Sequence, residues 1–537
     1  MSNSYTISGR LVDPIRRKII GAMLLVRDGI IEAIEESHNV DHVYIMPGFV
    51  DSHVHIESSM LIPTRFAEVA LRHGTVAAVT DPHEVANVAG IEGVRFMIEN
   101  SRHSKMKIFF GAPSCVPASP VDECFQPFTA LEIAELLELP EVTHLAEMMN
   151  FPGVINQNPT VKAILNEALV RNKPIDGHAP GLNGNSLVNY VSAGISTDHE
   201  CFTLDEAKQK IGLGMKVLIR EGSAAKNFDA LHPLIRINPP MVMFCTDDCH
   251  PDELLQGHIN RHVQKAISLG YDLFDVLQVA SVNPVKHYKL NVGLLQVGDP
   301  ADFIMVDNLK EFNVLSTFVN GIKVAEHKAS KSTSIPNYVF PESFDFSKLK
   351  IEFKTKSLVK VIKVIEGELI TDIFKTSVPV NGYDLDNDIL KIVVLSRYNP
   401  NNVGVGLIKG FGMKTGAIAA SIAHDSHHIV AIGTSDQSIV KVIEYILTNR
   451  GGICYYNDKE ILGLSLPYFG LMADVDPSIA AKNYSHINTK LKNDGCKLHA
   501  PFMTMAFMSL SVIPHLKLTP AGLFDVDAFK LTSIFAD

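Results

Sequence analysis

Short apolar runs that end in polar residues recur between residues 43 and 248 of the chain. The runs are VYIMPGFVD, GTVAAVTD, KIFFGAPS, VTHLAEMM, KPIDGHAP, GISTDHE, MKVLIREG and MVMFCTDD. The stretches between or after them have the spacing of amphipathic helices, over Pro63–Arg72, Leu131–Leu139, Thr160–Arg171, Leu204–Ile211 and Asp252–Leu269. Eight strand-then-helix units in series predict an α/β fold with a (β/α)8 TIM-like barrel. A doubly wound open sheet is the alternative.

Strand patterns of another kind lie on both sides of this region. Residues 1–45 alternate short apolar runs with turns, and GLLQVGDPADFIMVD and VLSTFVNGIKVAEH return to that pattern afterwards. We therefore expect residues 1–45 and 291–330 to form one composite β-sandwich, with the barrel over residues 46–290.

A separate unit is predicted at the C-terminal end. Residues 328–346 are rich in Ser, Pro and Lys, which is the composition of a linker. Beyond it, residues 345–537 contain strand patterns such as LVKVIKVIEG and ILKIVVLSR, and helical patterns over Ser435–Thr448 and Ile479–Lys492. This predicts a C-terminal α/β or α+β domain.

Charge and composition narrow the range of partners. The formal net charge is −11 and the pI is near 6.1, which argues against binding to nucleic acid or to an anionic membrane. No apolar run approaches the roughly 20 residues that a membrane-spanning helix needs. The seven cysteines are scattered without a C-x-x-C pair, which is typical of reduced thiols in a cytoplasmic protein. A small-molecule substrate fits these features best.

Candidate metal ligands stand at the C-terminal ends of the predicted strands, where barrels of this type build their active sites. They are His53, His55, Glu147, His178, His199, Asp247 and Asp248. His53 and His55 are two residues apart on one strand and point the same way, so both can hold one ion. The whole set is large enough for two divalent ions that share a bridging group, and imidazole and carboxylate donors suit Zn, Mn or Fe.

Other polar clusters leave alternatives open. The sequence Asp81-Pro82-His83-Glu84 ends the second strand and either lines the substrate pocket or caps the next helix through Asp81. Cys245 and Cys249 flank two aspartates and are better interpreted as core thiols than as zinc ligands. The run His424-Asp425-Ser426-His427-His428 is either a loop over the barrel mouth or a solvated turn. The deaminases that act on polynucleotides are unlike this chain, which has H-x-E but no P-C-x-x-C.

Several of these motifs resemble a known family. PGFVDSHVHIESS, the eight-unit barrel and GLLQVGDPADFIMVD are similar to the amidohydrolase superfamily of metal-dependent hydrolases. Within it, HIESSM, TDPHEVANVAG, HLAEMMNFPGV, DGHAPG, STDHE, FCTDDCHPDEL and AHDSHHIVAIG resemble the bacterial and archaeal adenine deaminases. The resemblance covers nearly the whole chain.

The resemblance implies a role for each candidate. His53, His55, His178, His199 and Asp247 match the family's metal ligands, and Glu147 stands where many relatives have a carboxylated lysine. A binuclear centre of Mn or Fe, with Zn as an alternative, is implied.

The implied reaction is the hydrolysis of adenine to hypoxanthine and ammonia. Asp247 is expected to act as general base and then as acid. Glu57, which we expect two residues beyond His55 on the same face of the strand, is our candidate for the group that protonates a ring nitrogen, with Ser58 and His83 as weaker candidates. The other substrate-binding candidates are Asp248, His424 and Asp425.

The sequence leaves two alternative functions open and indicates an oligomeric state. Another hydrolase of cyclic amides or amidines is the alternative enzyme, and a barrel without activity that serves as a scaffold is the alternative from another class. Exposed strand edges in the terminal units favour a homodimer.

Overall fold

The barrel is built from strands that are buried on both faces. The computed structural model describes residues 4–223, 225–324, 333–351, 357–379 and 382–536. The barrel strands are β5 (Phe49–His55), β6 (Thr75–Thr80), β7 (Lys107–Ala112), β8 (Val142–Met148), β9 (Ile175–Gly177), β10 (Thr197–Asp198), β11 (Lys216–Arg220), β12 (Val242–Cys245) and β13 (Asp247–Asp248). Their apolar residues form near-continuous runs, because helices cover the outside and side chains fill the inside.

Two hydrogen-bonded parallel sheets form the curled wall of the barrel, in the orders β13-β5-β6-β7-β8-β9 and β10-β11-β12. Strand β12 runs into β13, which pairs with β5 so that Asp247 lies opposite Val54. At the other junction the backbone N–H of Ser196 donates to the carbonyl of Ile175 at 2.8 Å. The predicted barrel is therefore confirmed, and the open-sheet alternative is wrong.

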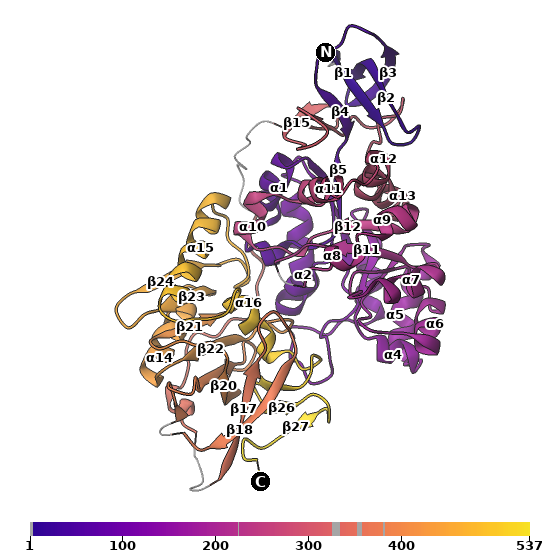
Figure 1. Ribbon diagram of the computed structural model, residues 1–537. Helices are drawn as coiled ribbons and strands as arrows, with labels where there is room; N and C mark the ends of the chain where they lie inside the picture. Colours follow the sequence, from indigo (N-terminus) through magenta and orange to yellow (C-terminus); the bar gives the residue numbers. More distant parts are fainter. Residues whose placement is uncertain (1–3, 224, 325–332, 352–356, 380–381, 537) are drawn as a thin grey trace.

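Helices follow most barrel strands and lie on the outside (Figure 1). They include α1 (Pro63–Arg72), α2 (His83–Ser101), α3 (Ala130–Leu137), α4 (Phe151–Ile155), α5 (Pro159–Val170), α6 (Gly184–Ser192), α7 (Leu204–Gly212), α8 (Phe228–Leu231), α9 (Leu234–Ile237), α12 (Leu273–Leu277) and α13 (Asn283–Tyr288). The single helix predicted over Asp252–Leu269 is wrong: the segment forms α10 (Pro251–Gln256) and α11 (Ile259–Ser268). Gly257 separates them in an extended conformation, and Asn260 accepts the backbone N–H of His258.

Both ends of the barrel region contribute to one seven-stranded sheet, at the top of Figure 1, in the order β16-β15-β14-β4-β1-β2-β3. The strands are β1 (Ser4–Asp13), β2 (Lys18–Arg27), β3 (Ile30–Glu36), β4 (Tyr44–Pro47), β14 (Phe303–Val306), β15 (Val314–Val319) and β16 (Ile322–Lys323). Strands β4 and β14 pair directly, and a hydrophobic cluster that includes Leu24 and Phe303 is shared by strands from both ends. Residues 325–330 of the predicted sandwich lie outside the described residues.

The C-terminal unit has its own eight-stranded sheet, in the order β18-β17-β20-β19-β22-β21-β23-β24. Its strands are β17 (Leu358–Val364), β18 (Thr371–Ser377), β19 (Leu390–Leu395), β20 (Val403–Lys409), β21 (Ala417–Ala420), β22 (Ile429–Gly433), β23 (Gly452–Tyr456) and β24 (Ile461–Ser465). The helices of this unit are α14 (Asp436–Thr448), α15 (Pro477–Asn493) and α16 (Pro501–Ala506), and a small sheet of β25 (Leu516–Thr519), β26 (Gly522–Asp525) and β27 (Lys530–Leu531) follows.

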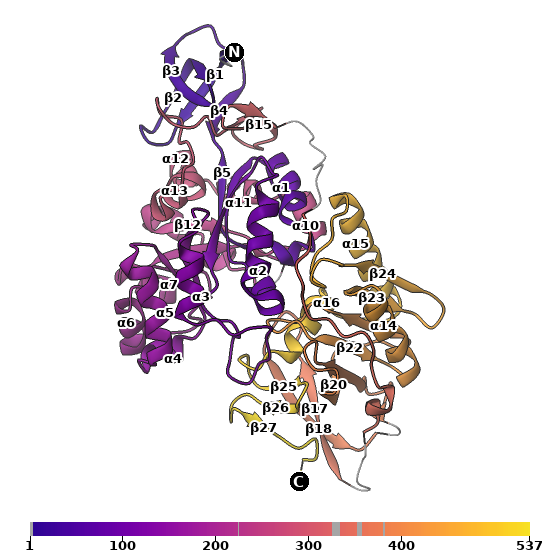
Figure 2. The ribbon, with the colours of Figure 1, turned by 180° about the vertical axis from the view of Figure 1, so that it is seen from behind.

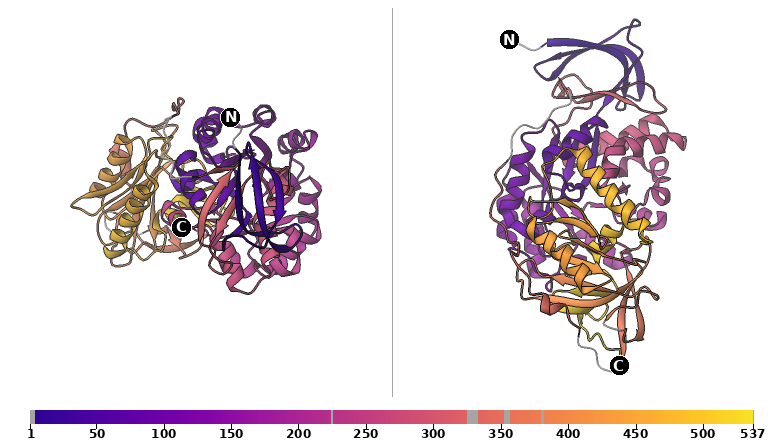
Figure 3. Two further views of the ribbon diagram at one scale, coloured as in Figure 1. Left: turned by 90° about the horizontal axis from the view of Figure 1, so that it is seen from above. Right: turned by 90° about the vertical axis from the view of Figure 1, so that its left-hand side faces the viewer.

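The C-terminal unit packs against the side of the barrel, as Figures 2 and 3 show from behind and from above. Arg65 Nε of α1 lies 2.7 Å from Asp474 Oδ1, and the backbone N–H of Ala473 donates to the carbonyl of Met60. Tyr484 of α15 lies 2.8 Å from His250 through its hydroxyl. These contacts flank the C-terminal face of the barrel strands, so the unit is placed to reach the active-site rim.

The described part of the chain contains no helix long and apolar enough to cross a membrane. None of the seven cysteines forms a disulfide, and Cys245 and Cys249 are buried, as expected for core thiols.

A buried lysine joins the ends of two barrel strands beneath the rim. Lys210 Nζ lies 2.7 Å from Asp198 Oδ2 and 2.8 Å from Glu206 Oε1, and it donates to the carbonyl of Ala179. Asp198 precedes His199, and Ala179 follows His178. The lysine therefore fixes the positions of two rim histidines.

We expect Lys210→Met to destabilise the protein by about 3–5 kcal/mol, because it leaves the buried Asp198 carboxylate without its cation. A lower midpoint of thermal unfolding, followed by circular dichroism, would show this. Lys208→Met on the same helix is the control, since Lys208 is half-exposed. Equal midpoints for the two variants would contradict the structural role of Lys210.

Candidate active site

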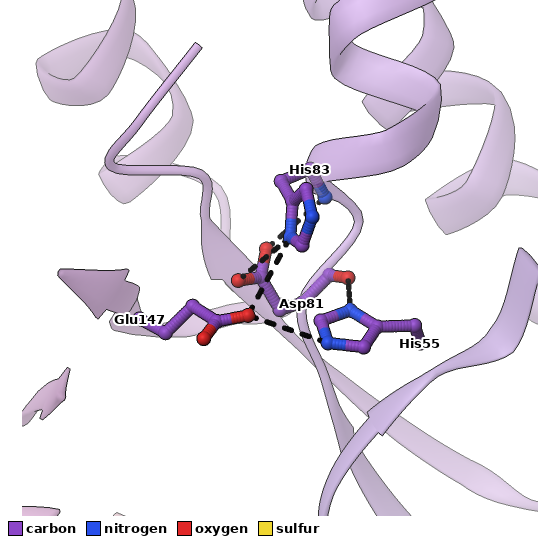
Figure 4. A group of neighbouring side chains, drawn as sticks. All are labelled: His55, Asp81, His83 and Glu147. Atoms are coloured by element: carbon purple, nitrogen blue, oxygen red, sulfur yellow. Dashed lines mark hydrogen bonds and ion pairs between the residues drawn. The ribbon is translucent and has the colours of Figure 1, made fainter. Parts of the chain in front are cut away.

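The rim residues converge on one buried region at the C-terminal ends of the barrel strands. His53 and His55 end β5, Glu147 lies in β8, His178 follows β9, His199 follows β10 and Asp247 lies in β13. All are buried except His178, whose side chain is 28 % exposed. Four ligand-type groups of this region, His55, Asp81, His83 and Glu147, point toward one another in Figure 4.

The two histidines of β5 face each other through ring nitrogens. His53 Nε2 lies 3.2 Å from His55 Nε2, and His55 Nδ1 lies 3.0 Å from the carbonyl of Asp81, which can only accept. In the neutral ring the Nδ1 of His55 therefore carries the proton, and its Nε2 presents a lone pair. Burial, together with the neighbouring His199 and His55, lowers the pKa of His53 well below its ordinary value, whereas Asp247 and Glu147 raise the pKa of His55 well above it despite burial. Two rings with converging nitrogens, next to two carboxylates, fit a metal ion.

Glu147 divides its two oxygens between two groups of histidines. Its Oε1 lies 3.3 Å from His55 Nε2 and 3.8 Å from His53 Nε2, while its Oε2 lies 2.7 Å from His178 Nδ1 and 3.4 Å from His199 Nε2. Burial alone would raise the pKa of Glu147, but His178 and His199 hold it well below its usual range. Glu147 therefore presents one oxygen to each histidine pair and joins the two halves of the rim.

Asp247 completes the rim on the opposite side. Its Oδ1 lies 3.1 Å from His55 Nε2 and 3.8 Å from His53 Nε2, and its Oδ2 accepts a hydrogen bond from Arg220. The residue has a φ of 58°, a left-handed conformation that is uncommon for aspartate and typical of functional sites. Despite burial, Arg220 and the nearby histidines keep the pKa of Asp247 well below its usual range, so it is an anion at neutral pH.

Arg220 and Glu200 were missed by the sequence analysis. Arg220, at the end of β11, forms ion pairs with both Glu200 and Asp247, and Glu200 Oε1 lies 3.4 Å from His199 Nε2. Arg220 ends β11 and Glu200 closely follows β10, so the rule that found the other rim residues would have pointed to them as well.

Asp81 and His83 follow the second strand and lie beside the rim histidines. Asp81 Oδ1 accepts the backbone N–H of His83 in the first turn of α2, although the N-cap position is Pro82 and Asp81 is not the capping residue. The other oxygen, Oδ2, lies 3.3 Å from His83 Nδ1, which is 3.7 Å from Glu147 Oε1. His83 thus adjoins the metal-ligand cluster and is also a candidate ligand.

Glu57 and Ser58 lie beside the histidines but not on their strand. Strand β5 ends at His55, and the two residues belong to the 3-10 helix η1 (Ile56–Ser59), so the expectation that Glu57 continues the strand face is wrong. Burial and the neighbouring Glu84 raise the pKa of Glu57 to about 8. Its Oε1 accepts the N–H of Val85 at 3.2 Å. Ser58 Oγ donates to Asp248 Oδ1 at 2.5 Å.

The loop after β21 closes over this rim. Its residues His424 to His428 are all buried, so the solvated-turn alternative is wrong. His424 Nδ1 lies 3.0 Å from Glu84 Oε1, and Asp425 Oδ1 lies 3.9 Å from His83 Nε2. The buried Arg397 holds the loop in place, because its guanidinium donates to the carbonyls of His427 at 2.6 Å and Ser421 at 2.9 Å.

Several buried polar atoms between the rim and this loop have no hydrogen-bond partner among the described residues. They are Glu57 Oε2, Asp81 Oδ2, His83 Nδ1, Glu84 Oε2, Asn87 Oδ1, Asp425 Oδ2, Ser426 Oγ and His427 Nε2. Buried polar atoms are nearly always paired in native proteins, so such a concentration marks the place of a polar ligand.

Comparison with known proteins matches both the barrel region and the C-terminal domain to known families. Residues 44–324 match the model of the amidohydrolase family, and residues 368–530 match that of the adenine deaminase C-terminal domain. An adenine deaminase of Methanosarcina mazei is 47 % identical and aligns over 98 % of this chain and 99 % of its own. The chain belongs to the adenine deaminase family.

Other members of the family align in the same way. An adenine deaminase of Borreliella burgdorferi is 44 % identical over 98 % of both chains, and one of a Sulfurovum species is 48 % identical over 96 % of this chain and 97 % of its own. Among solved structures, an N-acetyl-D-glucosamine-6-phosphate deacetylase of Mycobacterium smegmatis is 14 % identical and aligns over 60 % of this chain and 99 % of its own, with a TM-score of 0.46. The amidohydrolase family is metal-dependent, which agrees with the buried His, Asp and Glu clusters of the rim.

We expect His55→Ala to lower the bound divalent metal by at least half, because it removes a nitrogen that faces both Glu147 and Asp247. Elemental analysis of metal-loaded, desalted protein measures this. His103→Ala, at an exposed position, is the control. An unchanged metal content in the His55 variant would show that the rim histidines do not hold the metal.

Proposed function

We propose that this protein hydrolyses adenine to hypoxanthine and ammonia. The observation that carries the proposal is the relation to proteins named adenine deaminase over nearly the full chain, the C-terminal domain included. The same C-terminal domain contributes the loop that covers the rim, so both matched regions contribute to one site.

We propose that two divalent ions occupy the rim. His53, His55, Glu147, His178, His199 and Asp247 would hold them, with Glu147 as the bridging carboxylate. Mn and Fe are our first candidates and Zn is the alternative, since all accept imidazole and carboxylate donors. When bound, such an ion lowers the pKa of its water toward about 7 and so makes hydroxide available at neutral pH.

Asp247 serves as the general base and then as the general acid in this proposal. It is an anion on the rim, and it takes one proton from the water that attacks C6 of adenine. It returns that proton to the amino group, which then leaves as ammonia. Arg220 keeps the carboxylate oriented, because it binds the oxygen that does not face the histidines.

Glu57 supplies the proton for the heterocycle. With a pKa near 8 the carboxyl group is protonated at neutral pH, and its unpaired oxygen lies in the pocket. It protonates a ring nitrogen as water adds to C6. When the C6 hydroxyl becomes the carbonyl of hypoxanthine, its proton restores Glu57. Ser58, His83, Asp248, His424 and Asp425 complete the proposed substrate pocket.

Alternative functions have distinct outcomes in one assay. Metal-loaded protein is offered adenine, a hydantoin and a dihydropyrimidine. Ammonia and hypoxanthine from adenine support the proposal, whereas ring opening of either cyclic amide supports another amidohydrolase activity. No turnover together with no bound metal would indicate a scaffold protein.

The proposed domain division keeps the composite β unit over 1–45 and 291–330, the barrel over 46–290 and the C-terminal domain over 345–537.

We further propose a cytoplasmic homodimer. Sedimentation of the purified protein would measure its oligomeric state.

We expect Glu57→Gln to lower kcat for adenine by two orders of magnitude or more, in the range typical of a lost acid–base group. The amide can still donate a hydrogen bond but cannot release a proton. Hypoxanthine formation is followed by absorbance, and bound metal is measured on the same preparation. Full activity with normal metal content would refute the assignment.

A further inference from the structure

One buried carboxylate at the junction of the two domains has no role in the reaction described above. Glu84 lies in the first turn of α2 and is only 1 % exposed. It faces the loop of the C-terminal domain, and its neighbours are His424, His427 and Ser58.

The two oxygens of Glu84 have different surroundings. Oε1 lies 3.0 Å from His424 Nδ1 and accepts from Ser58 Oγ at 3.5 Å. Oε2 has no hydrogen-bond partner among the described residues, and the nearest ring nitrogen, His427 Nε2, is 3.8 Å away and itself unpaired. A buried carboxylate oxygen without a donor is unfavourable, so a donor on a ligand is expected there.

The ring nitrogens around Glu84 define what its second oxygen can bind. His424 Nδ1 lies 3.0 Å from Oε1 and His427 Nε2 lies 3.8 Å from Oε2, so the carboxylate is flanked by two imidazole rings. A carboxylate oxygen can only accept a hydrogen bond, so the ligand group opposite Oε2 must be an N–H or O–H.

We propose that Glu84 Oε2 accepts the ring N–H of the free purine base and thereby determines substrate specificity. This inference rests on the proposed function. Adenine has one ring N–H in its imidazole half, and a substituent on that nitrogen removes the donor. An unpaired buried carboxylate would then reject the substituted base, because sites built around a hydrogen bond discriminate strongly against analogues that lack it.

A cation is the alternative occupant of the group formed by Glu84, Asp248 and His424. One ligand atom each from Glu84, Asp248 and His424 lies within 4.8 Å of the others, which is close enough for a third cation. In the structure, however, His424 Nδ1 already faces Glu84 Oε1, and Asp248 Oδ1 accepts from Ser58. The purine is therefore preferred, and the cation is an outcome of the test.

The test compares adenine with 7-methyladenine and 9-methyladenine in wild-type protein, Glu84→Gln and Glu84→Ala. The wild type should favour adenine by about 100-fold or more in kcat/KM. In both variants the ratio of kcat/KM for adenine to that for the methylated bases should fall at least tenfold, mainly through a higher KM for adenine. Where methylated bases are not turned over, their inhibition constants replace kcat/KM.

Glu123→Gln is the matched control. Glu123 accepts from Asn402 of the C-terminal domain at 3.0 Å, so it lies at the same domain junction but is partly exposed. This variant should keep the wild-type preference, and metal content and thermal midpoint are measured for every variant.

The possible contrary results distinguish a failure of the proposed function from a failure of the role inferred for Glu84. If wild-type protein releases no ammonia from adenine, the proposed function fails. If the wild type is active and both Glu84 variants keep its preference for adenine, this inference alone is overturned. Loss of one metal equivalent in the Glu84 variants would also overturn it in favour of a third cation.

Discussion

Two ring nitrogens, His53 Nε2 and His55 Nε2, face each other across 3.2 Å between the carboxylates of Glu147 and Asp247, and this convergence organises the site. The carbonyl of Asp81 fixes the tautomer of His55, so its lone pair is directed inward. Glu147 then spans both pairs of histidines, and Asp247 approaches from β13. The closed barrel allows this convergence because the carboxyl ends of its parallel strands meet on one rim.

A surrounding set of buried ion pairs holds these groups in position. Arg220 fixes one oxygen of Asp247 and also pairs with Glu200, while Lys210 joins the strand ends that carry His178 and His199. Buried charges of this kind contribute little net stability, but the loss of one partner is costly. Their main effect here is to keep the rim groups in one arrangement.

The C-terminal domain covers the barrel rim with the loop His424–His428. The buried Arg397 has no acidic partner among the residues that the structure describes, and its guanidinium donates to carbonyl oxygens of the loop and its neighbours. This arrangement directs His424 and Asp425 to the barrel, where they meet Glu84 and His83. The facing residues of the two surfaces are buried, which strengthens each electrostatic interaction within them. The pKa values of Glu57 and Glu84, two buried carboxylates that interact with each other, are therefore shifted in opposite directions: that of Glu57 is raised by burial and Glu84, and that of Glu84 is lowered by His424 and His427 despite burial.

The sequence by itself determined the barrel, the composite end strands and the rim set of His53, His55, Glu147, His178, His199 and Asp247, because strand periodicity and strand order are local properties. It also indicated the family through its motifs. It could not decide between a loop and a turn for His424–His428, nor identify Arg220 and Glu84 as partners of the site. It also placed Glu57 on the strand, although the backbone turns into a 3-10 helix after His55. Those features depend on which distant segments pack together: only the docking of the C-terminal domain buries Glu84 against His424, and burial together with the neighbouring charges shifts the pKa of each carboxylate.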